Sequence, residues 1–159
     1  MIKTRKSVIA IISIFFLSVL PGCFNLESKK VGKEKGLVVI NVLDKKLYDD
    51  CHIPGSICVP FKDVKKYAPR NIDKDAEIVL YCSNYLCSSS GVNRKQLVDL
   101  GYKNVWVYKG GTAEWYQRGY PVDGPCTASY LKKELKKPAK KEAYVIDIKS
   151  LKKKLDAKK

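Results

Sequence analysis

The chain lacks the residue patterns that build most zinc sites. It has a single histidine, His52, and none of its six cysteines are spaced as C-x-x-C. Zinc is usually held by Cys and His ligands at such short spacings, so we expect no metal. Long apolar runs are also missing. The longest, residues 8–20 (VIAIISIFFLSVL), has 13 residues and is too short to span a bilayer comfortably.

Acidic residues are few, and the resulting positive charge is unevenly distributed. The chain has 16 acidic and 31 basic residues and a formal charge of +15. Segment 129–159 alone has 12 lysines against four acidic residues, so the preceding part of the chain is only mildly basic. Aromatic residues are not interleaved with the basic segment, and we therefore expect no nucleic acid partner. A length of 159 residues fits one domain with extensions.

The amino terminus has the features of an export signal. Lys3, Arg5 and Lys6 precede the apolar residues 8–20, which is the order typical of a secretory signal peptide. The export signal implies that the protein works outside the cytoplasm.

Residues 20–23, Leu-Pro-Gly-Cys, resemble the lipobox of bacterial lipoproteins. The resemblance implies that residues 1–22 are a lipoprotein signal peptide and that Cys23 becomes the lipidated first residue. Several acyl chains would hold the protein on a membrane of the bacterial cell envelope, at its periplasmic or extracytoplasmic face. An uncleaved anchor and ordinary secretory cleavage are the alternatives. Residues 23–36 are polar and Lys-rich, as expected of a tether.

From residue 37 onward, short apolar segments alternate with segments of helical character. The pattern predicts strands at 37–42, 57–61, 78–81 and 105–108, and helices at 63–67, 88–100 and 112–118. Strands that alternate with helices are typical of α/β folds with a mostly parallel sheet. Such sheets bind ligands at the carboxyl ends of their strands.

Cys82 lies at one of these ends. It follows the predicted strand 78–81 and precedes the predicted helix 88–100. Unpaired N–H groups and the helix dipole favour an anion at such a position, and they lower the pKa of a thiol from its usual value of about 8.5. The same stretch, taken alone, also fits a small buried residue at a strand end.

Five segments, in this order, resemble a single-domain rhodanese. They are residues 40–42 (INV), 51–56 (CHIPGS), 79–82 (VLYC), 100–115 (LGYKNVWVYKGGTAEW) and 119–122 (GYPV). The resemblance covers residues 37–124 and implies the rhodanese-like three-layer α/β fold, with short helices on both faces of a mostly parallel sheet. Residues 125–159 then form a Lys-rich C-terminal extension.

The resemblance implies sulfur transfer without a cofactor or a metal. In this family a cysteine thiolate takes the sulfane sulfur of a donor such as thiosulfate or a polysulfide, and the resulting persulfide passes it to a thiol or another nucleophile. The expected partners are this donor, a thiol acceptor and a redox protein. The nucleophile corresponds to Cys82. The substrate-binding loop, whose amides surround the charged sulfur, corresponds to Ser83, Asn84, Tyr85, Leu86 and Ser88.

This loop departs from the family pattern, because residues 83–88 contain neither Gly nor Arg. Without a glycine, any left-handed backbone conformation in the loop must fall on Asn84 or a serine. Without a loop arginine, Arg94 supplies the missing positive charge only if it faces the loop. A catalytically inactive binding or sulfur-carrier module is therefore a competing hypothesis. A phosphatase of related fold is excluded, because it needs an Arg six residues after the nucleophile, where this chain has Ser88.

Cys87 lies five residues beyond Cys82 on the same loop, within reach of a disulfide. Three hypotheses remain open. Cys87 resolves a persulfide or sulfenate on Cys82 by forming a disulfide, which would also suit a thiol–disulfide redox protein. Alternatively, Cys87 is itself the nucleophile. The third hypothesis is a spare cysteine or one half of a static disulfide.

Lipidation of Cys23 would leave five cysteines, so at least one must be free or pair outside the chain. Cys51 and Cys58 flank a turn and would either pair with each other or simply pack, whereas Cys126 has no evident mate. By the resemblance, His52 is a structural part of this turn rather than a base.

The C-terminal extension has an apolar face that allows three interpretations. Tyr144, Ile148, Leu151 and Leu155 recur at helical spacing among lysines. The segment is an amphipathic helix on an anionic membrane, a solvated and partly disordered appendix, or, at residues 144–148, an additional strand.

Overall fold

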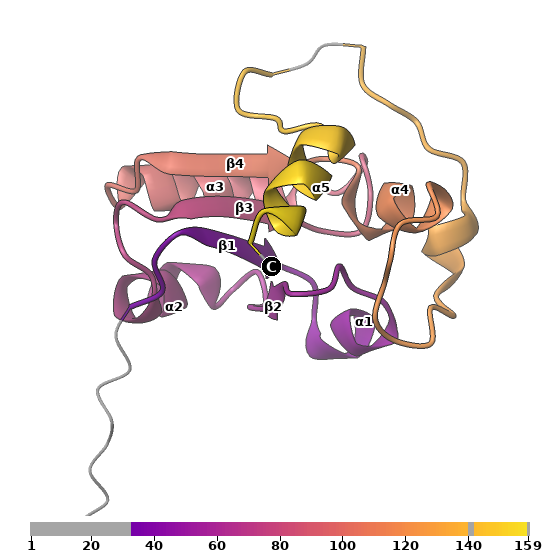
Figure 1. The fold of residues 1–159 in the computed structure, drawn as a ribbon, viewed down its shortest axis with the longest axis horizontal. Helices are drawn as coiled ribbons and strands as arrows, with labels where there is room; N and C mark the ends of the chain where they lie inside the picture. The colour runs from indigo at the N-terminus through magenta and orange to yellow at the C-terminus, as the bar shows by residue number, and fades with distance from the viewer. Residues whose placement is uncertain (1–32, 140–141, 159) are drawn as a thin grey trace, which may run out of the picture. The chain divides into compact units, whose positions relative to one another are not determined.

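The computed structural model describes residues 33–139 and 142–158, which belong to the compact unit Val31–Lys159 (Figure 1). The predicted signal peptide and the lipidation site Cys23 lie outside the described residues. The elements are β1 (Leu37–Asn41), α1 (Lys45–Asp50), β2 (Ile57–Cys58), α2 (Val64–Asn71), β3 (Glu77–Tyr81), α3 (Ser89–Asp99), β4 (Asn104–Tyr108), α4 (Gly111–Gln117), the 3-10 helix η1 (Ser129–Lys132) and α5 (Ile148–Asp156).

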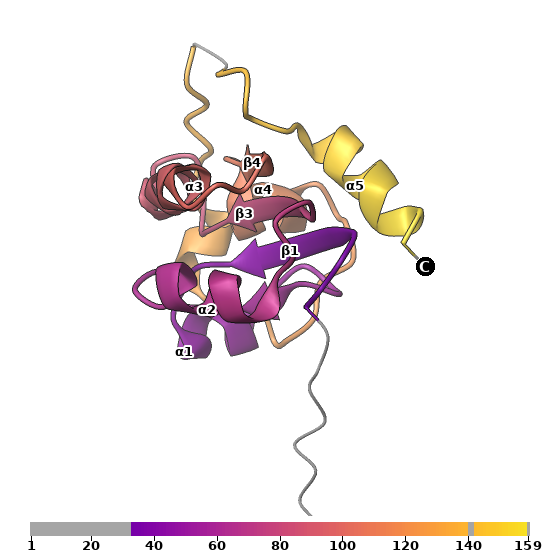
Figure 2. The same ribbon diagram turned by 90° about the vertical axis from the view of Figure 1, so that its left-hand side faces the viewer.

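The four strands form one parallel sheet in the order β2-β1-β3-β4, so the predicted α/β class is confirmed. Alternate residues of β3 point to opposite faces. Ile78 and Leu80 pack with residues of α2 and α3, whereas Val79 and Tyr81 pack with residues of α4 and α5. Figure 2 shows α3 and α5 on opposite sides of the sheet. Both faces are thus covered, which gives three layers.

Helix α1 was not expected from the sequence. Its amino terminus is capped by Asp44, whose carboxylate accepts a hydrogen bond from the Leu47 N–H at 2.9 Å. An Asp at this position commonly starts a helix, so Asp44 was the available sequence signal. Apolar spacing gave none, because α1 has no buried residue.

Helix α3 is present as expected, and polar residues form part of its buried face. Val92 and Val98 are exposed, whereas Ser90, Asn93 and Leu97 are buried. The Asn93 side chain donates a hydrogen bond to the carbonyl of Phe61 at 3.0 Å. The buried Asn93 side chain therefore joins α3 to the segment between β2 and α2.

The C-terminal extension packs on the sheet. Leu151 of α5 is fully buried and Ile146 is 7% exposed, both in the cluster on the α4 side of the sheet. Val145 pairs in parallel with Val107, and this single bridge is all that the described residues form of the proposed additional strand. Tyr144 precedes the helix, which begins at Ile148.

The predictions of a helix that lays its apolar face on a membrane, and of a disordered appendix, are therefore wrong for α5. Its apolar face is covered by the chain's own core. Within residues 33–139 and 142–158, no helix has both the length and the apolar character needed to cross a bilayer.

Candidate functional site

Cys82 lies immediately after β3, at the carboxyl edge of the sheet, and the residue is 2% exposed. The first turn of α4 holds its backbone in place. The Thr112 N–H donates to the carbonyl of Cys82 at 3.0 Å, and the Ala113 N–H donates to that of Ser83 at 2.9 Å. Gly111 has φ +61°, and a Cβ there would collide with the carbonyl oxygen of Cys82. This close approach requires glycine.

Cys82 and Cys87 form a disulfide, with their Cα atoms 6.5 Å apart. The Ser90 hydroxyl, in the first turn of α3, lies 3.9 Å from the Cys82 sulfur. Cys87 is therefore not a spare cysteine. A resolving role, a nucleophilic role and a static disulfide all remain compatible with this oxidised state.

The loop between the two cysteines is organised by Asn84. Its side-chain oxygen accepts from the Leu86 N–H at 3.0 Å, and its carbonyl accepts from the Cys87 N–H at 3.1 Å. These two N–H groups thus donate to Asn84 and do not point at a sulfur atom. Leu86 itself is 74% exposed and Ser88, the N-cap of α3, is exposed as well.

No residue of this loop adopts a left-handed backbone conformation, so neither Asn84 nor a serine has to supply one. Among the described residues, the one non-glycine residue with positive φ is Cys126, at 53°. The turn at Asn84 is closed by its side-chain oxygen, which accepts from the backbone N–H two residues on. Such a turn does not require positive φ.

Arg94 does not replace the missing loop arginine. Its Nε donates to the carbonyl of Val105 at 3.0 Å, and its guanidinium lies 4.0 Å from the centroid of the Tyr144 ring. Lys109, at the end of β4, was not considered from the sequence. A Cβ placed on Gly91 would lie 3.6 Å from the Lys109 Nζ, which brings this cation to the first turns of α3.

Glu114 of α4 interacts with Tyr85 of the loop, with β4 and with the C-terminal extension. The sequence did not predict a role for it. The carboxylate is buried, accepts from the Tyr108 hydroxyl at 3.1 Å and pairs with the Lys137 Nζ at 2.8 Å. Burial, followed by a hydrogen bond to Glu114, raises the pKa of Tyr85. No signal in the sequence indicated this role, because the burial of Glu114, which makes partners necessary, is set by the folded chain.

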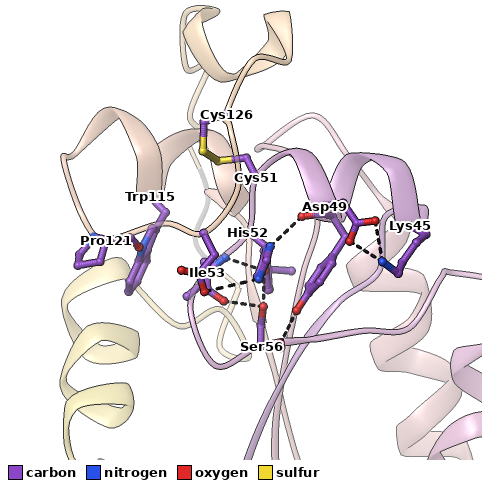
Figure 3. Close-up of polar contacts among 12 residues, drawn as sticks. Lys45, Asp49, Cys51, His52, Ile53, Ser56, Trp115, Pro121 and Cys126 are labelled. Atoms are coloured by element: carbon purple, nitrogen blue, oxygen red, sulfur yellow. Dashed lines mark hydrogen bonds and ion pairs between the residues drawn. A yellow bond between two sulfur atoms is a disulfide. The ribbon is translucent and has the colours of Figure 1, made fainter.

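The pairing of Cys51 with Cys58, one of two options left open, does not occur. Cys51 forms a disulfide with Cys126 instead, with a Cα separation of 4.6 Å (Figure 3). Cys58 is a free thiol, which agrees with the odd cysteine count. The sequence could not indicate this pair, because 75 positions separate its members.

His52 has the contacts of a structural residue. Its Nδ1 donates to the carbonyl of Tyr48 at 2.8 Å, its ring stacks on the Tyr48 ring, and its Nε2 lies 3.7 Å from the Asp123 carboxylate. In the described residues, no group of three or more Cys, His, Asp or Glu side chains is placed to hold a metal ion.

The chain is thus a parallel α/β domain with a cysteine at a strand end, on a loop that leads into a helix, and such strand ends and helix amino termini commonly bind ligands and anions. The sequence model of the rhodanese-like domain matches residues 25–118. The chain therefore belongs to the rhodanese-like domain family.

Two relatives and one solved structure illustrate the similarity. The chain is 26% identical over 91 residues to thiosulfate sulfurtransferase GlpE of Coxiella burnetii, across 57% of this chain and 82% of that protein. The corresponding protein of Pseudomonas syringae is 28% identical over 97 residues, across 61% and 88% of the two chains. The crystal structure of a Bacillus halodurans protein superposes with a TM-score of 0.55 at 26% identity, covering 62% of this chain and 72% of that one.

Proposed function

We propose that this protein is a sulfurtransferase that carries a sulfane sulfur on Cys82 and releases it by forming the Cys82–Cys87 disulfide. The observation that supports the proposal most is the position of this pair, on a loop between β3 and α3 at the carboxyl edge of the sheet. The similarity to thiosulfate sulfurtransferases supports the same class of donor.

In the first step the Cys82 thiolate attacks the outer sulfur of thiosulfate. The sulfur–sulfur bond of the donor breaks, and sulfite leaves with the electron pair. Cys82 then carries a persulfide, whose negative charge is favoured by the amino terminus of α3. With a polysulfide donor, the leaving group is the shortened polysulfide.

In the second step the Cys87 thiolate attacks the Cys82 Sγ. The intramolecular disulfide forms, the terminal sulfur leaves with the electron pair, and one proton from solvent converts it to hydrosulfide, HS−. An external dithiol, such as a reduced redox protein, then reduces the disulfide and is itself oxidised. An external thiol that attacks the persulfide first would take the sulfur directly.

The experiment begins with purified protein that has been reduced and freed of reductant. Addition of thiosulfate should release one sulfide per chain and restore the disulfide. In Cys87→Ser, which cannot resolve the persulfide, the Cys82 peptide should gain the mass of one sulfur. A Cys87→Ser protein that gains no sulfur from thiosulfate or from a polysulfide would overturn the proposal.

Cys58→Ser is the matched control, because Cys58 is the free thiol outside the loop and burial raises its pKa. This variant should behave as the wild type does. Cys82→Ser should gain no sulfur. A persulfide found on Cys87 in Cys82→Ser would instead assign the nucleophile to Cys87.

A thiol–disulfide redox protein is the second candidate function. It is favoured by the disulfide itself and by the loop without Arg, which provides no guanidinium for a small anion. Such a protein would oxidise dithiols in the absence of any sulfur donor and would release no sulfide from thiosulfate. The inactive sulfur-carrier module would neither oxidise dithiols nor release sulfide.

We also propose that lipid on Cys23 attaches the domain to a membrane of the bacterial cell envelope. The order of a basic segment, an apolar segment and Leu-Pro-Gly-Cys supports this. Expression in a bacterium should place the wild type in the detergent phase after phase separation, whereas Cys23→Ala should move to the aqueous phase. Equal partitioning of the two proteins would exclude lipidation at Cys23.

A further inference from the structure

A cavity of about 720 Å³ lies beside the cysteine loop, and it does not include Cys82. Its walls are Tyr85 of the loop, the end of β4 and α4, and residues of the C-terminal extension. Pockets for small molecules commonly have volumes of about 300 to 1,000 Å³. The cavity is therefore large enough for an organic ligand, and the sulfur chemistry proposed above does not use it.

The walls combine aromatic and aliphatic side chains. Three tyrosines, Tyr85, Tyr108 and Tyr120, face the aliphatic residues Val145 and Ile148 of the extension. Tyr120 is held by an edge-on contact with the Trp115 ring. Such a surface favours the apolar body of a ligand, since burying it removes hydrocarbon from water.

The acidic groups of the cavity already have partners. Glu114 pairs with Lys137 and accepts from Tyr108. Asp147 caps α5 by accepting from the Ser150 N–H and hydroxyl, both at 2.9 Å.

Glu142 accepts a hydrogen bond from the Tyr144 hydroxyl, and this bond raises the pKa of Tyr144. Each of the three carboxylates thus already accepts a hydrogen bond or forms an ion pair within the protein itself.

Lys137 is paired with Glu114, but the other three basic groups of the cavity have no ion pair among the described residues. Lys109, Arg118 and Lys149 line it, and within the described part of the chain none of the three takes part in an ion pair. Arg118 and Lys149 are exposed, as expected of groups at a rim. These three cations are thus available to an anionic group of a ligand.

We infer that this cavity binds an amphipathic organic anion, with its aromatic or alkyl body between the tyrosines and the extension and its acidic group near Arg118. The inference goes beyond sulfur transfer and does not depend on it. It also gives the C-terminal extension a role, because residues 145–149 form one wall of the site.

The probe is naphthalene-2-sulfonate, and naphthalene-2-sulfonamide is its uncharged counterpart of similar shape. Calorimetric titration of the purified full chain should show saturable binding of one sulfonate, with the sulfonamide about tenfold weaker. Arg118→Gln should weaken sulfonate binding about tenfold and leave sulfonamide binding unchanged, since a charge-assisted contact typically has this magnitude.

Lys103→Gln is the matched control. Lys103 is an exposed lysine that pairs with Asp75, and it precedes β4 at the opposite end of that strand from Lys109. Its loss should leave sulfonate affinity within twofold of the wild type. Absence of saturable binding, equal affinity for the two probes, or equal losses in Arg118→Gln and Lys103→Gln would each overturn the inference. Sulfur release from thiosulfate is measured separately, so the failure of either proposal is distinguishable.

Discussion

At the scale of single residues, Gly111 controls the geometry of the cysteine loop. The backbone from Gly111 to Ala113 packs directly on Cys82 and Ser83, and two hydrogen bonds join the segments. This contact combines a positive φ with a lack of space for a side chain. The sequence contains the Gly110-Gly111 pair, but the contact with Cys82 involves residues about 30 positions apart, and nothing in the local pattern indicates it.

Gly111→Ala should lower the free energy of unfolding by about 3 kcal/mol, because the alanine meets both backbone strain and a steric clash. Gly119→Ala is the control. Gly119 has a similar φ of +68°, but no atom lies within 4 Å of its potential Cβ. It should lose only about 1 kcal/mol, the strain alone. Urea titrations compare the two, and equal losses would show that the contact with Cys82 has no energetic role.

At the scale of elements, α5 completes the core. The strands of the sheet are buried on both faces, and on one face the cover comes from α4 together with α5. An apolar helical face among lysines is the same pattern in a membrane-binding helix and in a helix that packs on its own domain. The choice between them depends on whether an uncovered apolar face exists elsewhere in the chain.

Leu151→Ala should destabilise the protein by about 3 kcal/mol, since Leu151 is fully buried and the substitution leaves a cavity. Leu86→Ala removes the same atoms from a residue that is 74% exposed, and it should change stability by less than about 0.5 kcal/mol. Chemical unfolding followed by circular dichroism measures both. A small effect of Leu151→Ala would mean that α5 contributes little to the core.

Asp50, the last residue of α1, binds the segment that follows Cys126. Hydrogen bonds from the Thr127 hydroxyl and backbone, and from the Ala128 backbone, lower the pKa of Asp50 below the ordinary value of an aspartate. A lowered pKa in the folded state stabilises the protein above the unfolded value, and this contribution is lost as pH falls through the folded value.

Asp50→Asn should therefore be less stable than the wild type at pH 6, by no more than about 1 kcal/mol because the carboxylate is largely solvated. The difference should shrink as pH falls below 3.8. Asp49→Asn, at the exposed neighbouring carboxylate, is the control. A difference that does not depend on pH would assign the effect of Asp50→Asn to shape rather than charge.

At the scale of the whole molecule, two disulfides of very different span cross-link the chain. Cys51–Cys126 joins the end of α1 to the segment before η1 across 75 positions, whereas Cys82–Cys87 spans five. A cross-link stabilises by restricting the unfolded chain, and the restriction grows with loop length.

The double variant Cys51→Ser/Cys126→Ser should lose about 4 kcal/mol of stability, and Cys82→Ser/Cys87→Ser about 2 kcal/mol. Each is the control for the other, because both remove one disulfide and add two hydroxyl groups. Unfolding midpoints in guanidinium chloride provide the measurement. A larger loss in the short-span variant would mean that the cysteine loop is more important to stability than the entropy of its closure predicts.

The amino-acid sequence by itself determined the α/β class, the four strands and the position of Cys82 at the end of β3. These features depend on local apolar runs and on short motifs such as HIPGS and VLYC, which neighbouring residues specify together. Only the tertiary structure revealed the disulfide between Cys51 and Cys126, the interactions of Glu114 with Tyr85 and Lys137, and the packing of α5 on the sheet. These contacts join residues distant in the chain, so their formation depends on the completed sheet.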